Sequence, residues 1–142
     1  MNTFFNQIQK LDNVEEFKLR DSDDRNVYSF NYRGLTLSAV QIVKNEITLS
    51  RMNFSLLCED LLVRVSKEKI LEKINQFNKK VITLKIILQK IEENDAYFRF
   101  TVEYGISDEI FQYIELEDNL KLLFATPKVF INSLLNEDEN NE

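Results

Sequence analysis

The chain has 142 residues, of which 44% are hydrophobic and 30% are charged, and its formal net charge at pH 7 is −6. This length fits one compact domain. The absence of histidine excludes Ser-His and Cys-His nucleophile pairs, histidine-containing zinc sites and histidine acid–base catalysis. The only two glycines, Gly34 and Gly105, lie too far apart in the sequence for a phosphate-binding loop. Catalysis would rest on carboxylates, lysines and one thiol, so the composition favours a protein that binds over one that transforms a substrate.

The sequence also bears on the compartment. Residues 1–12 lack the basic start, the apolar run and the cleavage site of a secretory signal. No apolar run reaches the roughly 18 residues that span a bilayer. We therefore expect a cytoplasmic protein without a membrane partner. The single cysteine, Cys58, has apolar neighbours and no CxxC partner, so we expect an inert thiol that is buried or half-buried.

The first part of the chain predicts a short helix followed by a three-stranded antiparallel meander. An apolar stripe with helical spacing runs through residues 4–11, and apolar residues then alternate with polar ones over 28–32, as in a half-buried strand. Residues 35–43 and 47–54 are rich in strand-forming side chains, and turn residues separate the three segments. Segment 56–65 is ambiguous, and we assign it to the end of the sheet.

The middle of the chain predicts a helix and a hairpin. Ser66 is a suitable N-cap, and the apolar residues behind it repeat with helical spacing up to Asn78. Apolar residues then alternate with others over 82–88 and again over 98–104, with a polar turn between the two segments. These are the expected strands of a long hairpin.

The C-terminal part predicts a helical region and a tail. Ser107 is expected to cap a helix whose first turn is acidic, which suits the positive end of the helix dipole. Pro127 predicts either a kink near Ala125 or a second helix that begins there and runs to Leu135. Residues 137–142 are acidic and have nothing to bury, so we expect a disordered tail after a single domain over residues 1–136.

Two short motifs resemble functional sites but have simpler explanations. Asp21 and Asp23 match the first and third positions of a calcium-binding loop, whereas Arg25 and Tyr32 stand where that loop needs oxygen ligands. We therefore expect a solvated turn. The S-x-x-K spacing that begins at Ser66 lacks the SDN and KTG motifs of penicillin-recognising enzymes. We predict no catalytic, metal-binding or cofactor-binding residue.

Charge is distributed unevenly along the chain. Residues 1–63 carry 7 basic and 9 acidic side chains, 64–90 carry 8 and 2, and 91–142 carry 3 and 13. A nucleic-acid site favours arginine, exposed aromatics and a basic domain, so we predict no nucleic-acid partner for this acidic chain. The basic segment favours a solvated helix face or the steering of self-association or of a charged partner.

Three stretches of the sequence resemble the YbjN family, also called bacterial sensory transduction regulators. They are YSFNYRGLTLSAV, in the first hairpin, KILEKINQFNKKVITLKIIL, where a helix leads into a strand, and FRFTVEYGISDEIFQYI, where a strand leads into the last helix. The resemblance covers residues 1–136. It implies the α-β-β-β-α-β-β-α fold of class I type III secretion chaperones: an α+β domain whose antiparallel five-stranded sheet has its helices packed mainly on one face.

The resemblance implies a non-enzymatic, chaperone-like or regulatory protein that is a homodimer and binds a segment of a partner protein. An uncovered sheet face or a free edge would be the binding surface. The candidate residues for a partly exposed aromatic surface are Tyr28, Tyr32, Tyr97 and Tyr104; ordinary packing in the core or on the sheet is the alternative for each. Two other functions stay open: a self-associating structural protein, and a small enzyme that uses carboxylates or lysine.

Overall fold

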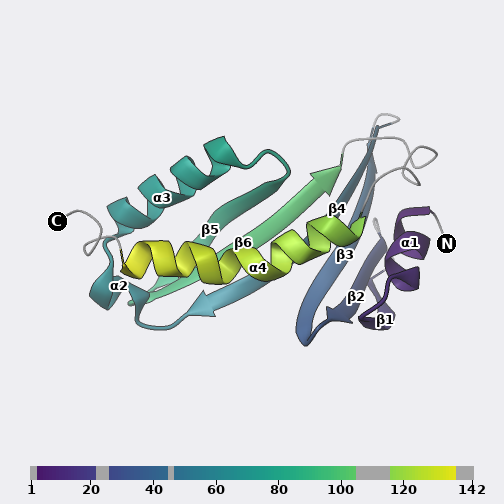
Figure 1. Ribbon diagram of the computed structural model, residues 1–142, viewed down its shortest axis with the longest axis horizontal. Coiled ribbons are helices and arrows are strands. Elements are labelled where there is room, and N and C mark those ends of the chain that lie inside the picture. Colours follow the sequence, from purple (N-terminus) through teal and green to yellow (C-terminus); the bar gives the residue numbers. More distant parts are fainter. Residues whose placement is uncertain (1–2, 22–25, 45–46, 105–115, 137–142) are drawn as a thin grey trace.

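The computed structural model describes residues 3–21, 26–44, 47–104 and 116–136, which form four helices and six strands (Figure 1). All six strands belong to one antiparallel sheet with the spatial order β1-β2-β3-β4-β6-β5. The α+β class is as predicted, but the sheet has one strand more than expected. In chain order the elements are α1 (Thr3–Lys10), β1 (Val14–Asp21), β2 (Asn26–Tyr32), β3 (Leu35–Lys44), β4 (Ile47–Cys58), α2 (Leu61–Arg64), α3 (Lys67–Lys80), β5 (Leu84–Glu92), β6 (Asp95–Tyr104) and α4 (Leu116–Leu135).

The additional strand is β1, which pairs with β2 and forms one edge of the sheet. Its sequence, VEEFKLRD, is mostly charged, so apolar and polar residues do not alternate along it. The register shifts twice, between Glu15 and Lys18 and between Leu19 and Asp21, and Glu16 has a positive φ of 56°. Charges and bulges are typical of edge strands. A strand with these features lacks regular alternation of apolar and polar residues, so alternation does not predict it.

Two local signals in the sequence act as predicted. The turn between β2 and β3 consists of Arg33 and Gly34, whose φ angles of 51° and 89° suit a two-residue hairpin turn of type I′. The side chain of Asn31 accepts a hydrogen bond of 2.9 Å from the Gly34 N–H. At the start of α3, the Ser66 hydroxyl accepts a hydrogen bond of 3.2 Å from the Lys69 N–H, which is the expected N-cap.

The ambiguous segment 56–65 divides into two parts. β4 continues to Cys58, as the assignment to the sheet predicted, but residues 61–64 form the short helix α2. The change of direction is held by the β5–β6 hairpin, because the Asp60 N–H donates to the Asp95 carboxylate (2.8 Å) and the Leu62 N–H donates to the Asn94 carbonyl (3.0 Å). These contacts are distant in sequence, so local periodicity does not predict them.

The last helix, α4, is one continuous helix with Pro127 inside it. A second helix beginning near Ala125 is therefore not what forms. The residue before the proline, Thr126, donates its hydroxyl to the Leu122 carbonyl at 2.7 Å. The predicted cap at Ser107 and the predicted tail lie outside the described residues.

The hydrophobic core lies on one face of the sheet, because alternate residues of each strand point to that face. Helix α1 contributes Phe5, whose ring centroid is 4.4 Å from that of Tyr28 on β2. Helix α4 contributes Phe130, which is 5.4 Å from Phe98 and 6.2 Å from Phe100 on β6. Helix α3 buries Ile70, Ile74 and part of Phe77 in the same core. All three longer helices therefore cover the same face.

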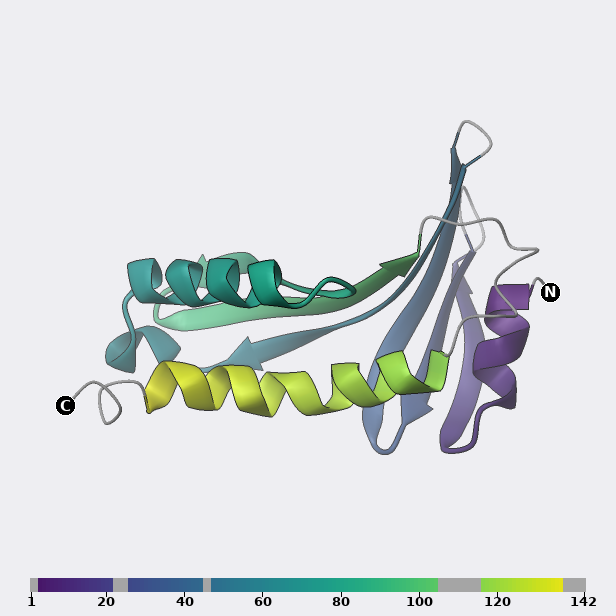
Figure 2. The same ribbon diagram turned by 45° about the horizontal axis from the view of Figure 1, so that its top comes forward.

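The sheet is strongly twisted, as antiparallel sheets are. Figure 2 shows β1, β2 and β3 rising steeply beside α1, while β5 and β6 run more nearly across the view beside α3. Helix α4 runs along the sheet from the α1 side to the α2 side (Figures 1 and 2).

Candidate functional site

The opposite face of the sheet carries the side chains that point away from the core, and no helix in the described ranges packs against it. Near the α2 end, two rows of residues cross β4, β6 and β5 on this face. Leu57, Tyr97 and Lys90 are paired in one row, and Ser55, Arg99 and Ile87 in the other. We call the following five residues the outer patch: Leu57, Ile87, Lys90, Tyr97 and Arg99.

The outer patch combines exposed apolar side chains with an aromatic ring that lies beside a lysine ammonium. Leu57 and Ile87 are each 42% exposed although they lie on central and edge strands of a sheet. Between them, Tyr97 is half-buried, and the Lys90 ammonium lies 4.4 Å from the centroid of its ring. This distance is typical of a cation–π interaction. Lys90 also forms an ion pair of 3.2 Å with Glu92 on the same strand.

A hydrogen-bond ladder holds the arginine of the patch. In the amide orientation that satisfies all three groups, Gln89 accepts hydrogen bonds from Arg99 (2.9 Å from Nη2 and 3.2 Å from Nε) and donates one of 2.8 Å to the Ser55 hydroxyl. The ladder therefore joins β6, β5 and β4 across the outer face. A fixed guanidinium loses little conformational entropy when it binds a second group.

The structure does not bring the four predicted tyrosines together. Tyr97 is the one that lies on the outer face. Tyr28 points to the core face and stacks on Phe17, with 4.7 Å between ring centroids. Tyr32 is fully buried and Tyr104 is 8% exposed. The expected exposed surface is therefore wrong for Tyr32 and Tyr104, because their positions on β2 and β6 have the parity of the core.

The environment of Tyr104 follows from this burial. Its hydroxyl is hydrogen-bonded to the Asn119 side chain on α4. Burial raises the pKa of Tyr104 to about 12, although the hydrogen bond with Asn119 lowers it. Tyr104 thus joins the end of β6 to α4 in its neutral form, which is a structural task.

Part of the outer patch has a signal in the sequence. Ile87 stands among the outward residues of its strand, where a polar residue is the norm for a sheet face in water. Leu57 belongs to the segment that periodicity left ambiguous. Arg99 gave no signal, because its importance comes from Gln89 on the neighbouring strand.

Among the described residues, the groups to consider for chemistry are the thiol of Cys58 and the carboxylates. Cys58, at the end of β4, is half-buried, and burial raises the pKa of its thiol. The raised pKa favours the protonated thiol at neutral pH, which is the less reactive form. Within the described ranges, no three His, Cys, Asp or Glu side chains gather as a metal site would require. The calcium-like motif at Asp21 and Asp23 falls largely outside the described residues.

Each edge of the sheet has a feature that hinders the addition of another strand. At the β5 edge, the side chain of Asn78 from α3 occupies the outward backbone groups of Ile86. Its Nδ2 donates to the Ile86 carbonyl at 3.0 Å, and its Oδ1 accepts from the Ile86 N–H at 2.9 Å. At the other edge, the bulges and charges of β1 interrupt the regular row of backbone groups.

The chain was compared with protein families, with curated proteins and with solved structures. No family model matches the chain, and no curated protein matches it in sequence. A crystal structure of YbjN from E. coli, described as a proposed transcription regulator, is similar over 82% of this chain and 81% of its own, with a TM-score of 0.43 and 12% sequence identity. A likeness with this TM-score and identity does not establish a shared family, so membership of the YbjN family stays a prediction. As for the bilayer, no helix in the described ranges combines the length and the apolar character needed to cross it.

Proposed function

We propose that this protein is a non-enzymatic interaction module, chaperone-like or regulatory, that binds a segment of a partner protein through the outer patch. The observation that carries the proposal is the pair of 42% exposed side chains, Leu57 and Ile87, beside a tyrosine covered by a lysine and an arginine hydrogen-bonded to Gln89. Tyr and Arg are enriched among residues that dominate binding energy at interfaces, and charged residues other than Arg are depleted there.

The arrangement supports binding on the face of the sheet over binding at its edges. Asn78 already satisfies the backbone groups of Ile86, and β1 is irregular. A partner segment would therefore gain affinity from side chains that cover Leu57 and Ile87, with hydrogen bonds to Arg99 at the rim. Covering a large aliphatic side chain contributes about 1–2 kcal/mol when it is half exposed beforehand.

Catalysis is the less supported alternative. The chain has no histidine, and the one thiol is kept protonated by burial. The described residues lack a cluster of metal-binding side chains. A homodimer through the outer patch is the competing proposal for this face, since a two-fold axis there would cover the same apolar side chains. Partner binding and self-association therefore compete for one surface, and one experiment can separate them.

The test is affinity capture from the native cytosol with the tagged protein, followed by light scattering of the eluted species. The informative variant is Leu57→Asp/Ile87→Asp, which places two charges in the outer patch. The matched control is Leu19→Asp, because Leu19 is also an exposed leucine on a strand (52%) but lies on β1. Circular dichroism checks that both variants are folded.

We expect the wild type and Leu19→Asp to retain one stoichiometric partner, and the double variant to lose it by tenfold or more, because each 1.4 kcal/mol is a factor of ten in affinity. Equal retention by the double variant would contradict the assignment to the outer patch. Recovery of the bait alone as a defined homo-oligomer, disrupted by the double variant, would instead support self-association as the use of this face.

A further inference from the structure

The outer face of the sheet has a second feature besides the outer patch, a pocket of about 120 Å³ over β1, β2 and β3. It lies on this face because Ser29 and Asn31 alternate with Phe30, which is buried in the core. Lys18 is paired with Ser29, and cross-strand partners share a face. The same holds for Thr36 and Asn31. We call this the donor pocket; its polar lining residues are Glu16, Lys18, Arg20, Ser29, Asn31 and Thr36.

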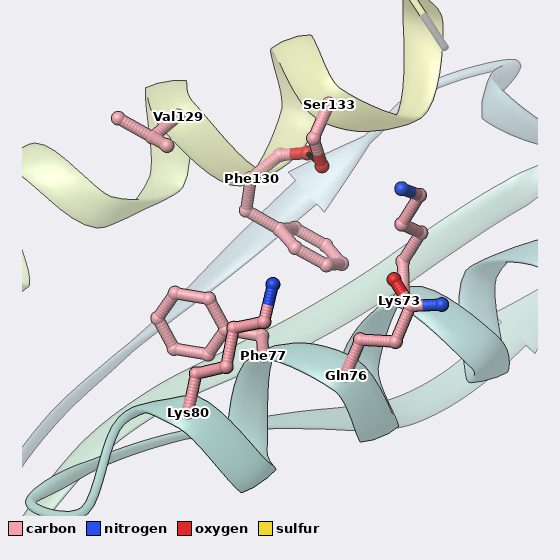
Figure 3. A pocket seen from close by; sticks show the side chains of 7 residues that line it. All are labelled: Lys73, Gln76, Phe77, Lys80, Val129, Phe130 and Ser133. Carbon is pink, nitrogen blue, oxygen red and sulfur yellow. Dashed lines mark hydrogen bonds between the residues drawn. The ribbon is translucent and has the colours of Figure 1, made fainter. Parts of the chain in front are cut away.

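The donor pocket differs from the cavity of about 170 Å³ between α3 and α4. Figure 3 shows the amine of Lys80 beside the rings of Phe77 and Phe130 in that cavity. Side chains of the protein itself therefore use the space between the two helices. The donor pocket lies instead on the sheet face that no helix in the described ranges covers, so a polar ligand can reach it from solvent.

Two hydrogen bonds orient the polar groups of the donor pocket. Arg20 Nε donates to the Ser29 hydroxyl at 2.7 Å, so the hydroxyl proton points elsewhere and can be donated. The Gly34 N–H donates to Asn31 Oδ1 at 2.9 Å, which leaves the Nδ2 group of that amide as the donor. Lysine and arginine side chains are donors only. The pocket therefore offers donors from neighbouring strands, and its ligand must be rich in acceptors.

A bulge in β1 brings two cations together. The register shifts between Leu19 and Asp21, so Arg20 has no residue opposite it on β2. Bulges redirect side chains in this way. The Arg20 guanidinium contacts Ser29, which is also the residue opposite Lys18. Among the described residues, no carboxylate forms an ion pair with either cation.

Charge and volume decide which acceptor-rich group fits. The lining has two cations and one carboxylate, that of Glu16, so the pocket is positive although the net charge of the protein is −6. A phosphorylated side chain carries about −1.5 to −2 charges and three acceptor oxygens. The volume of 120 Å³ equals that of roughly four water molecules in the liquid. It suits one phosphoryl group and is far below the roughly 300 Å³ at which cofactor sites begin.

The position of the donor pocket relative to the outer patch indicates what carries the phosphoryl group. A register row runs from Ser29 on β2 across β3 and β4 to Thr101 on β6. Arg99 of the outer patch lies on the same face, two residues from Thr101. Three strand spacings, about 14 Å, separate β2 from β6, and an extended segment advances about 3.3 Å per residue. About four to six residues therefore reach from the outer patch to the pocket.

We propose that the donor pocket binds a phosphorylated serine or threonine of the partner segment whose apolar side chains cover the outer patch. Lys18 and Arg20 contact the phosphoryl oxygens, and the hydroxyl and amide groups of β2 and β3 donate to them. The inference rests on the proposed function, because it specifies the chemistry of that partner. A nucleic acid is the less supported carrier, since its phosphates repeat along the strand and need a long basic surface.

The first probe is inorganic phosphate, titrated at about pH 7.5 into isotope-labelled full-length protein, where the phosphoryl charge is close to −2. Sodium chloride at equal ionic strength is the reference, and backbone amide shifts are followed by NMR. We expect saturable shifts that concentrate at Ser29, Asn31 and Thr36, with a dissociation constant on the order of 1–10 mM, because contacts with exposed charges are weak. Shifts no larger than those with chloride would overturn the proposal.

The second probe is the peptide acetyl-Ser-phosphoserine-Gly-Ser-Gly-Ser-Leu-Leu-amide, whose spacing matches the distance between the pocket and the outer patch. We expect it to bind about tenfold more tightly than inorganic phosphate, because the leucines add apolar contacts. The unphosphorylated peptide should bind at least about tenfold more weakly than the phosphorylated one. Equal binding of the two peptides would overturn the proposal. Tighter binding of a short oligothymidylate, with shifts of the same amides, would overturn it in favour of a nucleic acid.

Neutralising one charge at a time gives matched protein variants. Lys18→Gln and Arg20→Gln should each weaken phosphate binding by about threefold or more. Lys10→Gln removes the same charge from an exposed position on α1 and should change binding by less than about twofold. Glu16→Gln should strengthen binding by about twofold, because it removes the carboxylate from the lining. Equal effects of Lys18→Gln and Lys10→Gln, or weaker binding by Glu16→Gln, would overturn the proposal; the amide spectrum verifies that each variant is folded.

The inference and the proposed function fail in distinguishable ways. Loss of the captured partner in both Lys18→Gln and Leu57→Asp/Ile87→Asp would support both. If Lys18→Gln keeps the partner, and phosphatase treatment of the cytosol does not change capture, the inference is overturned and the proposed function stays in place. Phosphate binding in the donor pocket without any captured partner would overturn the proposed function, and with it the phosphorylated segment as the ligand.

Discussion

Replacing Asn78 tests how the exposed edge of the sheet is stabilised. Asn78→Ala removes the two hydrogen bonds of 3.0 and 2.9 Å to Ile86 on β5. Each such bond contributes about 0.5–1.5 kcal/mol, so the loss is about 1–3 kcal/mol. Alanine returns about 0.5 kcal/mol because it is the better helix former. The net expectation is a protein less stable by about 0.5–2.5 kcal/mol.

The control for this prediction is Asn75→Ala, one turn earlier on the exposed side of the same helix. It gains the helix propensity of alanine without touching β5, so it should be about 0.5 kcal/mol more stable than the wild type. The difference between the two variants therefore isolates the contacts with Ile86. Urea unfolding measures both free energies under identical conditions.

Hydrogen exchange locates the effect. The Ile86 N–H has its hydrogen bond to Asn78, so Asn78→Ala should speed its exchange far more than that of amides that bond to β6. The interpretation would be refuted if Asn78→Ala were as stable as Asn75→Ala, or if the Ile86 amide kept its protection. A rise in self-association of Asn78→Ala would further indicate that the amide also shields this edge from other chains.

Two further substitutions probe a helix cap and a buried phenol. Ser66→Ala should lower the free energy of unfolding by about 1 kcal/mol, because the Lys69 N–H loses its acceptor; an unchanged urea midpoint would contradict this. Tyr104 has a pKa of about 12 in the folded protein, against about 10 for a tyrosine in an unfolded chain. Only the unfolded chain therefore ionises between these values, and stability falls as the pH rises through this range. Between pH 8 and pH 11, Tyr104→Phe should therefore lose about 1.4 kcal/mol less stability than the wild type; equal losses would refute the assignment.

Regular alternation and helical stripes predicted those elements whose environment is uniform along their length. The strands around Phe30 and Phe100 have one dry face, and α3 has one apolar stripe behind a serine cap, so each pattern follows directly from burial. Strand β1 lies at the edge, where charges are useful and bulges are tolerated, so its sequence has no period. Periodicity reports burial, and β1 is scarcely buried.

The candidate site was harder to predict because it depends on partners across strands. Tyrosines are reasonable candidates for an exposed surface. Whether a tyrosine on a strand points to the core or to the outer face depends on its place in the alternation along that strand. Tyr97 and Tyr104 lie on the same strand an odd number of residues apart and therefore point to opposite faces. The Arg99 guanidinium is oriented by hydrogen bonds to Gln89, which lies at the register shift between Leu88 and Lys90 on β5.

The position of α4 has a consequence for synthesis of the protein. All six strands precede it in the chain, yet its side chains Leu120, Leu123 and Phe130 close the core over them. During synthesis, all six strands therefore leave the ribosome before α4, which covers Phe98 and Phe100 in the folded protein. Such intermediates are prone to aggregate. Slow translation just before the codons for α4 should lower the yield of native protein, whereas a pause after them should not.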